Sequence, residues 1–251
     1  MADGALEFAP LPPTTGRRTE QVIEAIRAAI DDGRMTPGVK YSGYQLAEML
    51  DISRTPVRDA LLRLEEIGII KFEARQGFRI LLPQPREIAE IFAIRIALEL
   101  PAARAAATGS TGTLVSALSD ERRRMQQAAA AGDERLFAHH DRCLHDLILE
   151  SAGNSRARAI VRSLRETTRL LGASTADRTR SLADIDAEHA PIIAAIGSGD
   201  AIAAAAAMRA HLVSTGRLLV GQALGDDVAE SVDEIWSAVV EKPDAADPPG
   251  S

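Results

Sequence analysis

The chain has 251 residues, of which 46% are hydrophobic and 26% are charged, and its formal net charge at pH 7 is −7. Its single cysteine, Cys143, excludes a disulfide framework, and no apolar run approaches the roughly 20 residues that a membrane-spanning helix needs. Residues 1–15 lack the positive segment and apolar core of a secretory signal, so we expect a cytoplasmic protein without a membrane partner, with disordered tails at 1–15 and 241–251.

Residues 42–50 carry the signals of a short helix. Ser42 and Gln45 have the spacing of a capping box, in which two side chains satisfy backbone N–H groups at a helix start. The helix should therefore begin near Gly43. Residues 51–53 are too few for anything but a tight turn.

A second helix is predicted from Pro56 to about Ile67. Proline suits the first helical position because its missing N–H would have no partner there, and Thr55 can cap the helix. Apolar residues recur every three or four positions and should form the buried stripe: Val57, Ala60, Leu61 and Leu64. This spacing leaves Arg58 facing outward, with Arg54 just ahead of the helix.

Two short strands should follow, because Gly68 ends the helix and apolar residues then alternate with polar ones. The alternating residues are Ile70, Phe72, Phe78, Ile80 and Leu82. Residues 74–77 would form the tip of the hairpin. A helix, a turn, a second helix and a hairpin in this order predict a winged helix-turn-helix, a shape that places one helix in the major groove of DNA.

Arg54 and Arg58 are the candidate groove contacts of this unit. An arginine can pair bidentately with guanine or neutralise a phosphate, although a single arginine on a helix is more often a solvated surface charge. The turn, the proline start and the hairpin occur with these arginines in one compact segment, which favours DNA binding. Residues 16–83 carry eleven Lys and Arg against ten Asp and Glu, so the acidic excess lies in the rest of the chain.

Pro83 and Pro85 mark the expected boundary between a DNA-binding domain at 16–83 and a second domain at 84–240. The second domain is rich in Ala, Leu, Ile and Arg without alternation, and its breaks predict about seven helices. The breaks fall at Thr108-Gly109, Gly132-Asp133, Gly153-Asn154, Ser174-Thr175, Gly197 to Asp200 and Gly225-Asp226. We therefore predict a mainly α protein, an N-terminal winged helix-turn-helix with a small β-hairpin followed by an all-α antiparallel bundle.

The histidines of the second domain suggest a metal site. His145 lies four residues after Asp141 on a helix predicted from about Glu134 to Ser151, so the carboxylate and the imidazole share one face. His189 and His211 lie on later helices, and inward-facing helices would gather all four side chains around a divalent ion. Each histidine taken alone is better explained as a surface or hydrogen-bonded core residue.

The N-terminal segment resembles a known family, the GntR family of bacterial transcription regulators. The segment LAEMLDISRTPVRDALLRLEEIGII of this chain is similar to the DNA-binding signature of that family. The segment VIEAIRAAIDDGRMTPG is similar to the family's first helix and the turn after it, and ARQGFRI is similar to its wing. The resemblance implies six DNA contacts: Arg54, Thr55, Arg58, Arg75, Gln76 and Gly77. Asp51-Ile52 stands where a Gly-Val pair is usual and Tyr44 where some relatives carry a cation, so the operator sequence does not carry across.

Three later segments resemble the FCD effector domain of the FadR-type subfamily: DRCLHDLILESAGN, EHAPIIAAIGSGD and MRAHL. The resemblance covers nearly everything from about Arg17 to Ala223 and implies a metal ion on four residues: Asp141, His145, His189 and His211. Leu144 replaces an aromatic residue of the family. Pro191 lies close to His189, where it can kink the helix.

Three imidazoles and one carboxylate leave a coordination position for water or an incoming carboxylate. We expect zinc, nickel or manganese, with zinc placed first, since the ligand set does not decide among these ions. Arg95 matches a family position that faces the cavity, and its guanidinium would anchor a small carboxylate effector. A salt bridge from Arg95 to Glu99 at i,i+4 explains this arginine equally well.

The predicted function is a homodimeric transcriptional regulator whose affinity for double-stranded operator DNA is controlled by a small organic acid at the metal site. Its two recognition helices would enter major grooves about 34 Å apart. The alternative is a metal-dependent hydrolase tethered to DNA by the winged helix, because an open three-histidine site can activate water. The sequence contains no nucleophile elbow, phosphate loop or dinucleotide motif, so we predict that the protein is not an enzyme.

Overall fold

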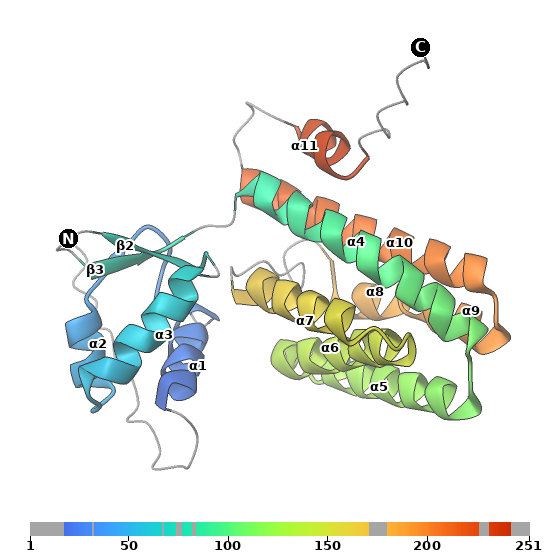
Figure 1. Cartoon of the computed structure of the whole chain (residues 1–251), viewed down its shortest axis with the longest axis horizontal. Coiled ribbons are helices and arrows are strands. Elements are labelled where there is room, and N and C mark those ends of the chain that lie inside the picture. Colours follow the sequence, from blue (N-terminus) through green and yellow to red (C-terminus); the bar gives the residue numbers. More distant parts are fainter. Residues whose placement is uncertain are drawn as a thin grey trace. The chain divides into compact units, whose positions relative to one another are not determined.

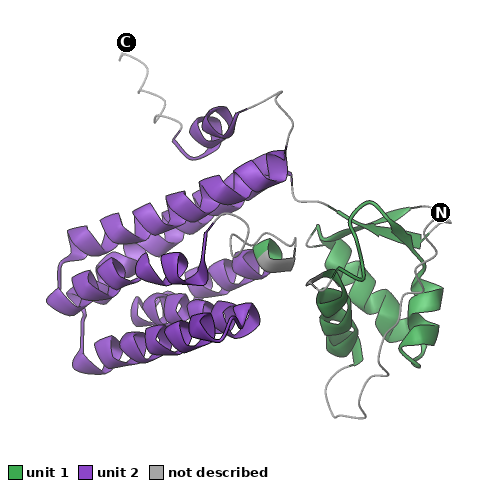
Figure 2. Ribbon diagram, turned by 180° about the vertical axis from the view of Figure 1, so that it is seen from behind, with its two compact units in different colours: residues 1–83, 167–173 green, residues 84–166, 174–251 purple. Residues whose placement is uncertain are grey.

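The computed structural model describes residues 18–31, 33–66, 68–73, 77–81, 84–170, 180–225 and 231–241. The chain forms two compact units, one made chiefly of residues 1–83 and the other chiefly of residues 84–251 (Figure 2). Helices dominate both units, and the strands form one small antiparallel sheet, which confirms the predicted fold class. The tails expected at 1–15 and 241–251 lie, apart from Glu241, outside the described residues.

The first unit contains three helices among its described residues, α1 (Arg18–Asp31), α2 (Gly43–Met49) and α3 (Arg54–Glu66) (Figure 1). The predicted start of α2 is confirmed, because the Ser42 hydroxyl accepts a hydrogen bond of 3.4 Å from the Gln45 backbone N–H. The turn between α2 and α3 is tight. Asp51 adopts a positive φ of 51° there, a left-handed conformation that a short polar side chain tolerates better than most.

The predicted start of α3 was too late by two residues. The helix begins at Arg54, so Thr55 does not cap it and Pro56 is its third residue. The first four backbone N–H groups of a helix have no partner within it, which is why proline is accommodated at this position too. The predicted buried stripe of α3 is confirmed, since Val57, Ala60, Leu61 and Leu64 are all buried.

The sheet of the first unit has three strands, one more than predicted. The expected hairpin is formed by β2 (Ile70–Glu73) and β3 (Gly77–Ile80), and β1 (Lys40–Tyr41) adds an outer strand in the order β1-β3-β2. Gly77 has a φ of 98°, and a Cβ at this position would lie 2.1 Å from the Tyr41 carbonyl oxygen. The pairing of β1 with β3 therefore requires glycine at residue 77.

One continuous apolar core joins the three helices of the first unit to its sheet. The Tyr41 and Phe78 rings lie 5.9 Å apart between their centroids and close the core at the sheet. The buried residues of this core are Val22, Ile26, Ala29, Met35, Leu46, Ala47, Leu50, Val57, Ala60, Leu61, Leu64, Ile69, Ile70, Phe78 and Ile80. Because α3 buries only its apolar stripe here, its opposite face remains exposed.

The second unit contains eight helices among its described residues: α4 (Pro85–Thr108), α5 (Gly112–Ala130), α6 (Glu134–Ser151), α7 (Ser155–Leu170), α8 (Leu182–Ala187), α9 (Ala190–Ser198), α10 (Ala201–Leu224) and α11 (Val232–Val239). Helix α4 begins at Pro85 itself. The proline is accommodated in the first turn of α4, where the Glu87 side chain accepts a hydrogen bond from the Gln84 N–H.

The predicted helix breaks near residues 108, 132, 153 and 199 are confirmed, whereas the break at 174 and 175 lies outside the described residues. An additional break separates α8 from α9 at Glu188 and His189. Pro191, near the start of α9, has no N–H to continue the hydrogen-bond ladder of α8. The proline thus starts a new helix instead of kinking a continuous one, and His189 is the residue before that helix.

The long helices α4 and α10 lie side by side, and α6 and α9 both pack against α4 (Figure 1). Helix α11 covers this pair through Trp236, which is fully buried. A Cβ on Gly216 of α10 would lie 2.4 Å from Trp236 Cη2 and 2.8 Å from Phe92 Cγ, so the three helices meet closely. Within the described residues, no helix is both long and apolar enough to cross a membrane.

Candidate metal centre and DNA-binding surface

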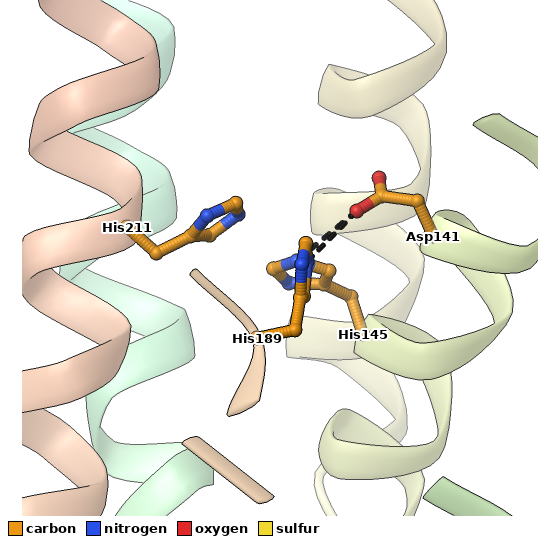
Figure 3. Close-up of side chains that lie close together, drawn as sticks. All are labelled: Asp141, His145, His189 and His211. Carbon is orange, nitrogen blue, oxygen red and sulfur yellow. Dashed lines mark ion pairs between the residues drawn. The ribbon is translucent and has the colours of Figure 1, made fainter. Parts of the chain in front are cut away.

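The structure brings Asp141, His145, His189 and His211 together inside the second unit (Figure 3). Asp141 and His145 lie one turn apart on α6, His189 caps α9, and His211 lies on α10. One ligand atom from each residue lies within 4.8 Å of the others. All three imidazoles are buried, so the site lies in the interior of the helical bundle and not on its surface.

Three polar atoms of this cluster are buried without a hydrogen-bond partner: Asp141 Oδ1, His145 Nε2 and His189 Nε2. The Asp141 oxygen lies 2.9 Å from the nitrogen of His189 and 3.9 Å from that of His145. A buried polar atom left without a partner costs about 1–3 kcal/mol, and a folded protein rarely keeps several at one point. A divalent cation would satisfy all three atoms, so the residues present fit a metal ion.

The opposite nitrogen of each imidazole is held by an acceptor. Nδ1 of His145 lies 2.5 Å from Glu99 Oε2, Nδ1 of His189 lies 2.9 Å from the Ile185 carbonyl oxygen, and Nδ1 of His211 lies 2.8 Å from Glu188 Oε2. Carbonyl and carboxylate oxygens only accept, so each Nδ1 donates its proton. Each Nε2 therefore keeps its lone pair, which is the arrangement that metal-binding histidines share.

The protonation states of these groups also suit a metal site. Burial, together with the nearby Arg165, lowers the pKa of His145 to about 3, and burial beside His189 lowers the pKa of His211 to about 4. Burial alone would raise the pKa of Asp141, but Arg165 and the imidazoles hold it well below its usual range. At neutral pH the carboxylate is therefore ionised while His145 and His211 are neutral.

Three arginines surround the cluster, and each is paired with an acid. Arg165 donates to Asp141 Oδ2, Arg95 Nε to Glu99 Oε1 at 2.7 Å, and Arg180 Nη1 to Glu188 Oε1 at 2.5 Å. In each pair the positive charge of the arginine is balanced by the negative charge of the acid. A bound divalent ion would therefore add positive charge that no residue of these pairs compensates.

Arg95 forms the salt bridge with Glu99 that the sequence analysis gave as the alternative to an effector anchor. Its pair with Glu99 is almost fully buried, with side-chain exposures of 5% and 1%, and its guanidinium carbon lies 4.7 Å from the centre of the Phe92 ring. The bond to Glu99 uses Nε, so the pair orients the guanidinium without using its two Nη groups.

Sequence reasoning missed Glu188, Arg165 and Arg180, and it considered Glu99 only as a partner of Arg95. The contacts of Glu99 and Glu188 with their histidines join residues 46 and 23 positions apart. Because no helical or strand period connects positions so distant, only the packing of the bundle brings them together.

Three of the six candidate DNA contacts are exposed at the start of α3. Arg54, Thr55 and Arg58 are all exposed on the first two turns of α3, and the two arginines are four residues apart, so they point the same way. Gly77 begins β3 at the described edge of the wing, whereas Arg75 and Gln76 lie outside the described residues.

A winged helix with exposed arginines on its recognition helix, joined to a helical unit with a buried ligand cluster, is the architecture of a DNA-binding transcriptional regulator. Residues 18–80 match the family described as "Bacterial regulatory proteins, gntR family", and residues 90–214 match the FCD domain. The chain belongs to the GntR family and carries an FCD domain, which makes it a transcriptional regulator and not an enzyme.

Relatives with curated names are regulators as well. An uncharacterized HTH-type transcriptional regulator in the TAR-I ttuE-ttuC' intergenic region of Agrobacterium vitis is 30% identical over 154 residues, which cover 60% of this chain and 90% of that protein. The probable D-xylose utilization operon transcriptional repressor of Paenarthrobacter nicotinovorans is 28% identical over 77% of this chain and 85% of its own length.

A solved structure with the same fold is that of McbR/YncC from Escherichia coli. It covers 83% of this chain and 99% of its own, with a TM-score of 0.68 and 24% sequence identity. At this identity the likeness establishes the fold alone.

Proposed function

We propose that this regulator holds a divalent metal ion through Asp141, His145, His189 and His211, and that a small carboxylate bound at this ion controls its affinity for operator DNA. The observation that carries the proposal is the convergence of three buried, unpartnered ligand atoms on one point. The ion would supply a Lewis-acidic position open to an oxygen ligand, and the order of preference we propose is zinc before nickel or manganese.

The charge around the site favours an anionic effector. The Arg165, Arg95 and Arg180 pairs are already neutral, and His145 and His211 are uncharged at neutral pH, so a divalent ion leaves a net positive centre in the bundle. A carboxylate compensates that charge. Arg95 would provide its second anchor, because Glu99 holds the guanidinium in place through Nε and leaves the Nη groups for a ligand.

The DNA-binding part of the proposal assigns six contacts: Arg54, Thr55, Arg58, Arg75, Gln76 and Gly77. Residues 16–83 would act as the DNA-binding domain and residues 84–240 as the domain for metal, effector and dimerisation. The homodimer would work in the cytoplasm on a two-fold operator. An effector that prefers one arrangement of the dimer by about 1–3 kcal/mol would change operator affinity about 5- to 150-fold.

Metal content tests the ligand set. The full chain is dialysed against zinc and then against metal-free buffer, and bound zinc is measured by elemental analysis. We expect one zinc per protomer in the natural chain and in His139→Ala, which removes an exposed histidine outside the cluster. His189→Ala should lose the ion. Equal zinc in His189→Ala and the natural chain would show that the ligand set is wrong.

Operator binding tests the effector. DNA from upstream of the chain's own gene is titrated with the zinc-loaded dimer, with and without a panel of small mono- and dicarboxylates. We expect one class of acid to change the affinity in the natural chain and to have no effect in His189→Ala. If every acid changes both proteins equally, the response does not pass through the metal site.

A further inference from the structure

Tyr44 and Arg54 form a cation–π pair at the start of the recognition helix. The guanidinium carbon of Arg54 lies 4.2 Å from the centre of the Tyr44 ring. Tyr44 lies in the first turn of α2 and Arg54 is the first residue of α3, so the tight turn between the helices brings them together. Tyr44 is 49% exposed and Arg54 is exposed as well, which places the pair on the surface of the unit.

The acids beside this pair do not hold the arginine. Glu48 and Asp51 line the same shallow pocket as Tyr44 and Arg54. Within the described part of the chain, no ion pair joins Arg54 to either acid, and its guanidinium contacts the Tyr44 ring. An ion pair would have to break before Arg54 could contact DNA, whereas the ring contact leaves its charge available.

The ring contact and base recognition use different parts of a guanidinium. The ring of Tyr44 contacts the guanidinium around its central carbon, and N–H groups directed away from the ring can pair with the O6 and N7 atoms of guanine. An exposed arginine without a neighbouring contact loses side-chain conformational entropy when it binds DNA. An arginine that is held against an aromatic ring has lost much of that entropy before binding.

We propose that Tyr44 is a positioning residue for DNA recognition, which fixes the Arg54 guanidinium so that it reads one base pair in each half-site. The inference rests on the proposed role of Arg54 as a DNA contact. A cation–π contact at an exposed site corresponds to about a two- to fivefold change in affinity for each half-site.

The test is selection of binding sites from random double-stranded DNA by the full-length protein. The natural chain is compared with Arg54→Ala, Tyr44→Ala and Tyr44→Phe. Val39→Ala is the control, because it shortens another exposed apolar side chain of the same unit, 47% exposed. Circular dichroism verifies that each variant is folded. Affinity for the selected site is then measured for every protein.

We expect Arg54→Ala to lose the preference for one base pair in each half-site. Tyr44→Ala should weaken the preference at that same base pair and reduce affinity about two- to fivefold per half-site, while Tyr44→Phe and Val39→Ala resemble the natural chain. If Arg54→Ala loses a base preference and Tyr44→Ala keeps it, the positioning role is wrong and the DNA contact stands. If Arg54→Ala changes no preference, the proposed contact itself fails.

Discussion

Glu99 and Glu188 determine which nitrogen of their histidines is available to an ion. Burial would raise the pKa of both acids, but Arg95 beside Glu99 and His211 beside Glu188 hold both pKa values below the usual range. The ionised carboxylates can only accept, so they fix the proton on Nδ1 of His145 and His211. At the proposed metal site the two acids would therefore act through the histidines and not as ligands themselves.

Replacing Glu188 by Gln should weaken metal binding about 10- to 100-fold, because the neutral amide holds the His211 tautomer less strongly and loses the pair with Arg180. The affinity is measured by competition with a coloured chelator. Glu121→Gln is a matched control, since Glu121 lies 2.7 Å from His140 outside the cluster. An unchanged zinc affinity in Glu188→Gln would contradict the role of this acid.

Arg58→Ala should reduce affinity for the upstream DNA about 5- to 150-fold, the loss expected for one arginine contact of about 1–3 kcal/mol to a base. The side chain is exposed on α3, so its removal should leave the fold intact. Fluorescence anisotropy gives the affinity. Arg104→Ala, an exposed arginine of α4, removes the same charge from the other unit and should bind as the natural chain does. Equal affinities of the two variants would argue against the assignment.

The sequence predicted the four members of the cluster but not the residues that orient them. Asp141 and His145 share a helix face through a period that is visible in the sequence, and the resemblance to the FCD domain implied all four residues. Glu188 and Arg165 gain their roles only through tertiary contacts, which leave no local signal. At this site the sequence therefore predicts the four proposed ligands but not the residues that hold them in place.

Helix boundaries were predictable where the capping chemistry is local. Helix α6 runs from Glu134 to Ser151 as predicted, because Asp133 caps its start and Gly153 follows its end in a left-handed conformation. Strand β1 was not predictable. It has two residues, and it exists only because it pairs with β3, which lies far along the chain.

The meeting of α4, α10 and α11 depends on a residue without a side chain. Gly216→Ala should destabilise the protein by about 1–3 kcal/mol, because the added methyl group would lie 2.4 Å from Trp236 and 2.8 Å from Phe92 in a packed core. Alanine gains up to about 1 kcal/mol over glycine in a helix, which is too little to offset the clash.

Thermal unfolding followed by circular dichroism measures this effect. Gly197→Ala in α9 is the control, since its Cβ would make an ordinary contact of 3.6 Å with Val115. We expect a lower Tm for Gly216→Ala and little change for Gly197→Ala. A Tm at or above that of the natural chain in Gly216→Ala would show that the three helices pack less closely than described.

At the scale of the whole molecule, binding of the proposed metal ion would be coupled to folding. The four proposed ligands lie on α6, on α10 and at the break before α9, so an ion could contact all of them only when these elements are packed together. An ion that binds only the folded state stabilises it by about 2.7 kcal/mol at 100 times its Kd.

Zinc at that excess should therefore raise the Tm by about 5–10 °C, since about 2–4 °C corresponds to each kcal/mol for a chain of this size. A chelator should reverse the shift. His189→Ala provides the comparison, because it lacks one ligand and should respond weakly. A shift of equal size in both proteins would locate the zinc elsewhere.

The central claim is that Asp141, His145, His189 and His211 hold a single ion, and anomalous diffraction from zinc-loaded crystals tests it most directly. We predict one anomalous peak per protomer at the point where Asp141 Oδ1 and the three Nε2 atoms converge, about 2.0–2.2 Å from each. Crystals that contain zinc but show no peak among these four residues would contradict the account.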